Sequence, residues 1–189
     1  MQTSSPLSRG QRLIAIARGS IEHALGLGAR VFVPLDDWLT QPAASFVTLT
    51  QDGALRGCIG SLEAHRALVE DVVANARAAA FHDPRFAPLT AREWPSVKVE
   101  VSVLTPMQPL PCRDEADLLA KLRPDLDGIA IEFGEHRATF LPQVWENLPA
   151  PSLFLRELKR KARLPESFWH PDIRVHRYGV EKFTEEVKP

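Results

Sequence analysis

Residues 46–60 read FVTLTQDGALRGCIG, in which Asp52-Gly53 separates two extended runs. An Asp-Gly pair between runs of strand-forming residues is the strongest short signal for a β-hairpin. The clearest single strand comes later in the chain, where valines alternate with polar residues from Val97 to Val103. This alternation predicts a strand with one buried face and one polar face, as in an antiparallel sheet.

Two helices are predicted around this hairpin. Ser8 and Gln11 form a capping box, and apolar residues then recur at helical spacing, so we expect a helix over residues 8–27. A second apolar run with the same spacing predicts a helix over residues 66–80. The first half of the chain therefore contains a hairpin, a helix and a strand, in that order.

The second half of the chain repeats this order. Asp114 is expected to cap a short helix that ends near Leu122. A hairpin is predicted next, over residues 129–141, and then a helix over residues 152–163. A last strand begins at residue 173. Gly134-Glu135 forms the turn of this second hairpin.

The repeated order predicts an α+β fold of two related hairpin, helix and strand units, with mainly antiparallel sheets and packed helices. We expect the units to be fused into one compact domain over residues 1–189. The two halves, roughly 30–110 and 111–183, indicate an internal duplication. Chance similarity between two short hairpins is the alternative explanation.

The composition is that of a globular protein. The chain has 189 residues, 44% of them hydrophobic, and a formal net charge of −1, so no overall field attracts it to nucleic acid or to an anionic membrane. Its start does not resemble a signal peptide, and no apolar run approaches the roughly 20 residues that span a bilayer. Two cysteines, Cys58 and Cys112, cannot build a disulfide framework. We therefore predict a cytoplasmic protein with reduced thiols.

The main candidate site is the strand that contains Cys58. On an extended strand, Arg56, Cys58 and Gly60 share one face, and glycines inside a strand usually mark the close approach of a ligand or of another backbone. A guanidinium beside a thiol stabilises the thiolate and makes it more nucleophilic. We expect Cys58 to be a nucleophile or covalent carrier and Arg56 to hold an anionic group. The alternative is that Cys58 is a small buried hydrophobic residue.

The neighbours of Cys58 complete this predicted ligand site. They are Gly57, Ile59, Gly60 and Ser61. If a helix starts soon after Ser61, its free N–H groups would also bind an anion.

The loop after the second helix is another candidate. His82 would serve as a base for Cys58 if the fold brings the two together. Asp83, Arg85 and Phe86 are expected to contact the ligand. The alternative is a structural loop in which Asp83 caps a turn and pairs with Arg85.

The polar face of the 97–103 strand supplies two more candidates. We expect Glu100 to give acid–base help and Ser102 to contact the ligand. A carboxylate on this face is either solvated or faces a cleft, and the sequence leaves both possibilities open.

No metal or cofactor is predicted. The six histidines have none of the paired spacings that build zinc sites, and no phosphate loop or dinucleotide fingerprint is present. The basic helix over residues 152–163 would suit nucleic acid, but a solvated helix face is the more usual explanation, and no aromatic stacking motif accompanies it. We therefore expect a small-molecule or peptide ligand, and neither nucleic acid nor a membrane.

Three blocks of the sequence resemble the AMMECR domain family. Residues 55–60 (LRGCIG) look like the hallmark hexapeptide of that family. Residues 83–90 (DPRFAPLT), followed by Glu93 and the strand over 97–104, fit its second block, and residues 127–145 fit its third.

The resemblance runs from about Gly10 to Phe183. Trp145 and Trp169 are typical of the prokaryotic branch, called AmmeMemoRadiSam system protein A. The resemblance implies an α+β fold of two related β-rich units and a cleft lined by the hexapeptide. It also implies partnership with a Memo-type protein, which is similar to extradiol dioxygenases, and with a radical S-adenosylmethionine enzyme.

The resemblance supplies no reaction, so two classes of function stay open. The first is an enzyme or enzyme component with Cys58 as its nucleophile. The second is a non-catalytic module that presents a peptide or ligand to partner enzymes.

Overall fold

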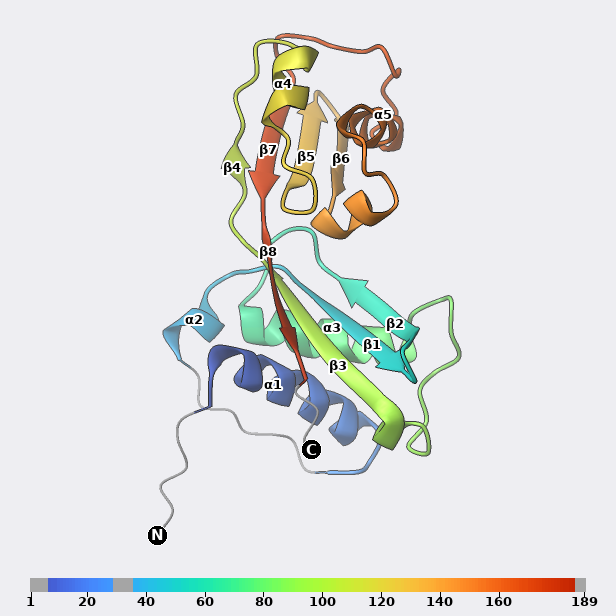
Figure 1. Ribbon diagram of the computed structural model, residues 1–189. Helices are drawn as coiled ribbons and strands as arrows, with labels where there is room; N and C mark the ends of the chain where they lie inside the picture. Colours follow the sequence, from blue (N-terminus) through green and yellow to red (C-terminus); the bar gives the residue numbers. More distant parts are fainter. Residues whose placement is uncertain (1–6, 29–35, 186–189) are drawn as a thin grey trace. The chain divides into compact units, whose positions relative to one another are not determined.

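The computed structural model describes residues 7–28 and 36–185 (Figure 1). The chain divides into two compact units. The first unit contains residues 1–104 and 181–189, and the second contains residues 105–180. No helix in the described ranges is both long enough and apolar enough to cross a membrane.

The first unit is built on a four-stranded sheet with the order β2-β1-β3-β8. The strands are β1 (Ser45–Gln51), β2 (Ala54–Gly60), β3 (Val97–Leu104) and β8 (Val180–Thr184). β1 and β2 form the predicted hairpin, and β1 also pairs with β3, antiparallel in both cases. Asp52 and Gly53 have φ angles of 51° and 82°, the left-handed conformation that a two-residue hairpin turn requires and that Asp-Gly adopts readily.

Helices α1 (Arg9–Ala24) and α3 (Leu68–Phe81) share one apolar core with this sheet. The valines of β3, as their alternation predicted, and Val47 and Leu49 of β1 point into that core. The predicted capping box is confirmed, because the Ser8 hydroxyl accepts from the Gln11 N–H and the Gln11 side chain accepts from the Ser8 N–H. The unit also has a one-turn helix, α2 (Asp37–Thr40), and a 3-10 helix, η1 (Trp94–Ser96).

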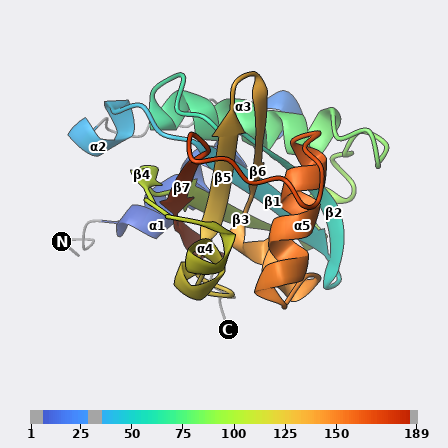
Figure 2. The ribbon, with the colours of Figure 1, turned by 90° about the horizontal axis from the view of Figure 1, so that it is seen from above.

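The second unit has a four-stranded sheet with the order β4-β7-β5-β6. Its strands are β4 (Gln108–Pro109), β5 (Gly128–Phe133), β6 (His136–Phe140) and β7 (Arg174–Tyr178). Helices α4 (Glu115–Lys121) and α5 (Pro151–Lys161) share a second core with this sheet (Figure 2). Asp114 caps α4, as predicted. The 3-10 helix η2 (Pro142–Glu146) carries Trp145, whose ring stacks on Phe154 with centroids 3.7 Å apart.

The two units share one strand order, and the predicted α+β fold with antiparallel sheets is confirmed. In each unit the first hairpin strand lies between its hairpin partner and a third strand, which gives β2-β1-β3 and β6-β5-β7. A helix separates the hairpin from the third strand in both cases, α3 in the first and α5 in the second. The fourth strands, β4 and β8, were not predicted. β8 follows β7 in the chain but belongs to the sheet of the first unit.

Candidate functional site

The outer face of the first sheet, the face that points away from the helices, carries Cys58. Thr48 on β1 lies between two cross-strand partners, Cys58 on β2 and Glu100 on β3. The Cys58 Sγ is 3.3 Å from the Thr48 Oγ1, and either atom can be the donor. Cys58, Thr48 and Glu100 are all partly exposed. The sheet thus brings the predicted thiol and the predicted carboxylate into one row, with a hydroxyl between them.

Thr48 was missed by sequence reasoning. It occupies a polar position of an alternating strand, which is typical of a solvated face. Only the register of the hairpin and of the β1–β3 pair makes it the neighbour of both Cys58 and Glu100.

An ion pair between buried Asp83 and exposed Arg85 fixes the backbone of Cys58. The Cys58 N–H donates to Asp83 at 2.9 Å, and the Arg85 guanidinium donates to the Cys58 carbonyl at 3.3 Å. Arg85 also donates to Asp83 at 2.7 Å. The Asp83 side chain is only 1% exposed, whereas that of Arg85 is 53% exposed. We call these two side chains the Asp83–Arg85 clamp.

The clamp is held in its charged form. The hydrogen bond from the Arg85 side chain, with those from the Cys58 and Arg85 backbone N–H groups, holds the pKa of Asp83 well below its ordinary value, although burial opposes this shift. The same pair raises the pKa of Arg85. The ion pair between Asp83 and Arg85 is the one expected if the loop has a structural role. In the structure the same pair also binds the backbone of Cys58.

Arg56 does not follow the simple alternation that the sequence predicted. A β-bulge interrupts the hairpin, because Gly57 pairs with Leu49 and Leu55 pairs with Thr50, so Arg56 faces no residue of β1. Such a bulge redirects the side chain that it carries.

The redirected Arg56 side chain forms an ion pair with Glu93. It donates to the Glu93 carboxylate at 3.0 Å and to the Ala87 carbonyl at 3.0 Å, and it lies over the Phe86 ring. Hydrogen bonds from Thr90 and then from Arg56 lower the pKa of Glu93 to about 2. The guanidinium that binds the Cys58 backbone is therefore that of Arg85, while Arg56 is matched by Glu93. The buried Arg56 Nη1 has no hydrogen-bond partner within the described ranges.

Both glycines of the hexapeptide are explained by packing. A Cβ on Gly57 would lie 2.2 Å from the Ala79 carbonyl oxygen of α3, and a Cβ on Gly60 would lie 2.2 Å from the Phe46 ring. Gly57 therefore permits the close approach of another backbone, one of the two reasons expected for a strand glycine. Ile59 packs against the core of the first unit.

Ser61 belongs to a buried polar network and not to a helix start. Helix α3 begins at Leu68, so the expected anion site at free N–H groups close to Ser61 is wrong. The Ser61 and Ser45 hydroxyls both donate to Asp71 at 2.7 Å. Asn75 donates to the same carboxylate at 2.8 Å. Asp71 and Asn75 lie four residues apart on the buried side of α3, and this spacing was the missed signal.

The remaining candidates have fewer contacts. His82 is exposed at the C-terminal end of α3, and no hydrogen bond joins its ring to Cys58 in the described part of the chain. Glu100 has no ion pair or hydrogen bond with another described residue. Ser102 is 1% exposed, and its hydroxyl lacks a hydrogen-bond partner among the described residues.

No group of three or more metal-ligating side chains occurs within residues 7–28 and 36–185. The basic helix α5 has few unmatched cations. Lys159 is fully buried and bound to Glu115 at 2.7 Å, Arg160 pairs with Glu157, and Lys161 donates to a backbone carbonyl. These contacts favour a structural use of its cations over nucleic-acid binding.

Comparisons with known proteins agree with the resemblance seen in the sequence. A family model described as AMMECR1 matches residues 14–183. A protein from Methanothermobacter thermautotrophicus is 38% identical over 192 residues, which cover 96% of this chain and 98% of the relative. Protein MJ0810 from Methanocaldococcus jannaschii is 34% identical over 191 residues, which cover 97% and 92% of the two chains.

The fold has also been observed experimentally in a relative. The crystal structure of the uncharacterised protein PH0010 from Pyrococcus horikoshii matches this chain with a TM-score of 0.77 and 34% identity, covering 94% of this chain and 91% of that one. The family model spans both units described above. The chain belongs to the AMMECR1 family.

Proposed function

We propose that the outer face of the first sheet is an enzyme-like site for a small ligand, with Cys58 as the reacting thiol. The observation that carries the proposal is the Asp83–Arg85 clamp. Buried Asp83 binds the N–H of Cys58 and its exposed partner Arg85 binds the carbonyl, while the thiol itself stays partly exposed. A cysteine that only fills the core needs no such fixation, and the core lies on the opposite face of this sheet.

Thr48 and Glu100 supply the proton path in this proposal. As the Cys58 sulfur adds to the electrophilic carbon of a C=O or C=C group of the ligand, the π bond of that group breaks and its electron pair moves to the oxygen or to the far carbon. The thiol proton passes to the Thr48 hydroxyl. The Thr48 proton moves at the same time to the Glu100 carboxylate. Adjacent strands place directly opposed side chains about 5 Å apart at Cβ, so the three groups lie in the order that the transfer requires. His82 is the alternative base.

The other predicted residues shape the site. Asp83 and Arg85 are positioning residues, and Phe86 packs beside both Arg56 and Arg85. Gly57, Ile59, Gly60 and Ser61 hold β2 against α3 and β1. Ser102 and Arg56 each keep a buried polar atom without a described partner, and in this proposal each is available to hydrogen-bond the ligand.

We further propose that the protein acts in the cytoplasm as an AmmeMemoRadiSam system protein A. A Memo-type protein and a radical S-adenosylmethionine enzyme would be its partners. This part rests on the sequence resemblance, and on two free thiols that suit a reducing compartment.

The second candidate is a non-catalytic module that presents a ligand or peptide to these partners. The clamp favours it as well, because Asp83 and Arg85 bind the backbone of the edge strand β2. Covering the backbone groups of an edge strand stabilises the sheet and requires no reaction at Cys58. A dependence of thiol reactivity on Glu100 separates the two candidates.

The test uses Cys112→Ser protein and a panel of small aldehydes and acrylamides, with modification of Cys58 followed by mass spectrometry. Glu100→Gln is expected to slow the modification about tenfold or more, because it removes the proton acceptor. Lys98→Gln is the matched control, since it removes a charge two residues away on the same face. Equal rates in Glu100→Gln and the parent would reject the catalytic role and leave the presenting module.

A further inference from the structure

β8 forms the edge of the first sheet opposite to the edge formed by β2. The Glu185 N–H donates to the Val99 carbonyl of β3 at 3.2 Å. Alternate residues of an antiparallel strand turn their backbone groups to opposite sides. The N–H and carbonyl groups of Lys182 and Thr184 therefore point away from β3, towards an edge on which no described strand lies.

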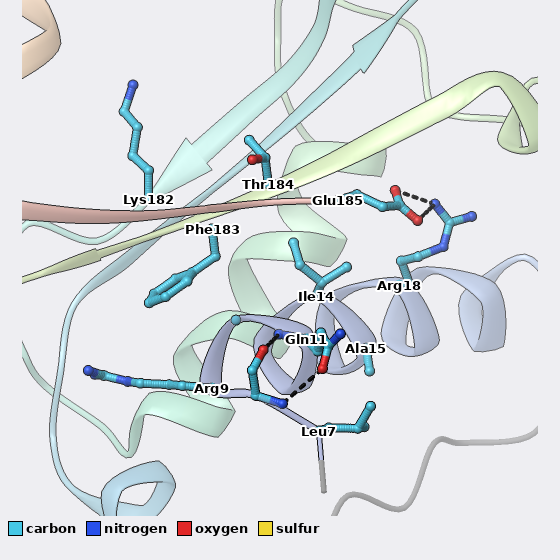
Figure 3. A pocket seen from close by; sticks show the side chains of 12 residues that line it. Leu7, Arg9, Gln11, Ile14, Ala15, Arg18, Lys182, Phe183, Thr184 and Glu185 are labelled. Atoms are coloured by element: carbon cyan, nitrogen blue, oxygen red, sulfur yellow. Dashed lines mark hydrogen bonds and ion pairs between the residues drawn. The ribbon is translucent and has the colours of Figure 1, made fainter. Parts of the chain in front are cut away.

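A groove runs beside this edge. It has a volume of about 660 Å³ and is lined by the first turns of α1 and by β8 (Figure 3). Leu7, Ile14, Ala15 and Phe183 form its apolar part. Figure 3 shows Phe183 on the α1 side of the strand and Lys182 and Thr184 on the other side. A strand added to β8 would therefore send alternate side chains into the groove.

The charges of the groove leave one cation unmatched. Arg9 pairs with Glu181 at 2.8 Å and Arg18 pairs with Glu185 at 2.9 Å, so these four charges cancel. Lys182 is exposed and has no ion pair with another described residue. The side chain that lies opposite Lys182 on an added strand is best matched by a carboxylate.

We propose that the β8 edge binds an extended segment of a partner protein in which apolar and acidic residues alternate. The backbone of the segment would pair with Lys182 and Thr184. Its apolar side chains would enter the groove at Ile14 and Phe183, and an acidic neighbour would meet Lys182. Peptides bind exposed sheet edges in this manner, with backbone hydrogen bonds giving affinity and alternate side chains giving specificity. This site is separate from the Cys58 site.

A second copy of this chain fits the edge less well. Two antiparallel β8 strands centred on Lys182 would place two lysines opposite each other. Centring them on Phe183 would oppose Glu181 to Glu185 of the other copy. Like charges in directly opposed positions destabilise a strand pair, and a lysine on an edge is a common protection against self-association.

The test uses a fluorescein-labelled peptide of about nine residues in which valine and glutamate alternate, together with its valine–lysine counterpart. Anisotropy is expected to detect binding of the acidic peptide, with about tenfold weaker binding of the lysine version. Three variants should weaken acidic binding by about tenfold or more: Lys182→Glu reverses the charge, Thr184→Pro removes an outward N–H, and Ala15→Phe fills the groove. Lys98→Glu, on the neighbouring strand β3, should bind like the parent.

Amide hydrogen exchange adds a readout of strand pairing itself. The Lys182 and Thr184 N–H groups should exchange fast in the free protein and slowly in the complex. Absence of acidic-peptide binding at about 1 mM, or equal binding by the parent, Thr184→Pro and Ala15→Phe, would overturn the proposal. A concentration-dependent dimer that Thr184→Pro abolishes would overturn it in favour of a second copy.

Discussion

Replacing Asp83 with alanine is expected to lower the free energy of unfolding by about 2 to 3 kcal/mol. The substitution removes a carboxylate that is 1% exposed and leaves the Cys58 N–H without its acceptor. The cost arises because the Cys58 N–H loses its charged acceptor, whereas the exposed Arg85 guanidinium stays solvated. Urea unfolding followed by circular dichroism measures the change.

The matched control is an exposed ion pair. Glu132 and Arg174 lie 2.7 Å apart with side chains 37% and 66% exposed, so Glu132→Ala should cost less than about 1 kcal/mol. A cost for Asp83→Ala no larger than that for Glu132→Ala would show that the clamp does not hold β2 in place.

The clamp also predicts a loss of stability in acid. The folded pKa of Asp83 is depressed below its ordinary value of 3.8, so its contribution is fully present above that pH. The contribution falls as the pH drops from there towards the depressed folded value. Asp83→Asn has no carboxylate to titrate, so the stability difference between parent and variant should shrink on acidification. A difference that stays constant from neutral pH to the acid limit would contradict this assignment.

The second large effect is expected at Gly57. Gly57→Ala would place a Cβ 2.2 Å from the Ala79 carbonyl oxygen, which is backbone and cannot turn aside. Either α3 or β2 must move, so we expect a loss of about 3 kcal/mol, at the upper end of overpacking costs. The same movement should disturb Cys58, the next residue in the strand.

Gly179→Ala is the control for Gly57→Ala. The nearest atoms to a Cβ at Gly179 are 3.5 Å and 3.7 Å away on the Thr105 side chain, which is ordinary van der Waals contact. Its unfolding free energy should stay within about 0.5 kcal/mol of the parent. Thermal and urea unfolding measure the stability of both variants. A Gly57→Ala protein as stable as Gly179→Ala would refute the packing argument.

The fold elements that could be predicted are those whose signals are local. The Asp52-Gly53 turn, the Ser8 cap and the Asp114 cap each depend on a few neighbouring residues, and all three occur as expected. β4 and β8 could not be found this way. β4 has only two residues, and β8 lies in a sheet whose other strands are far away in sequence.

The site was only partly predictable for the same reason. Cys58 and Glu100 were chosen by residue type, but Thr48 lies between them only through cross-strand register. The bulge at Arg56 also depends on strand pairing, so no local pattern indicates that this guanidinium binds Glu93. Arg85, four residues beyond the end of α3, binds the Cys58 carbonyl instead.

The most direct test of the central claim is the rate at which iodoacetamide alkylates Cys58 in Cys112→Ser protein, in native buffer and in urea. A fixed, partly exposed thiol beside Thr48 and Arg85 should react faster in the folded protein than in the unfolded chain, and Asp83→Asn should remove that advantage. A thiol that reacts only as the protein unfolds would contradict the account and make Cys58 a packing residue.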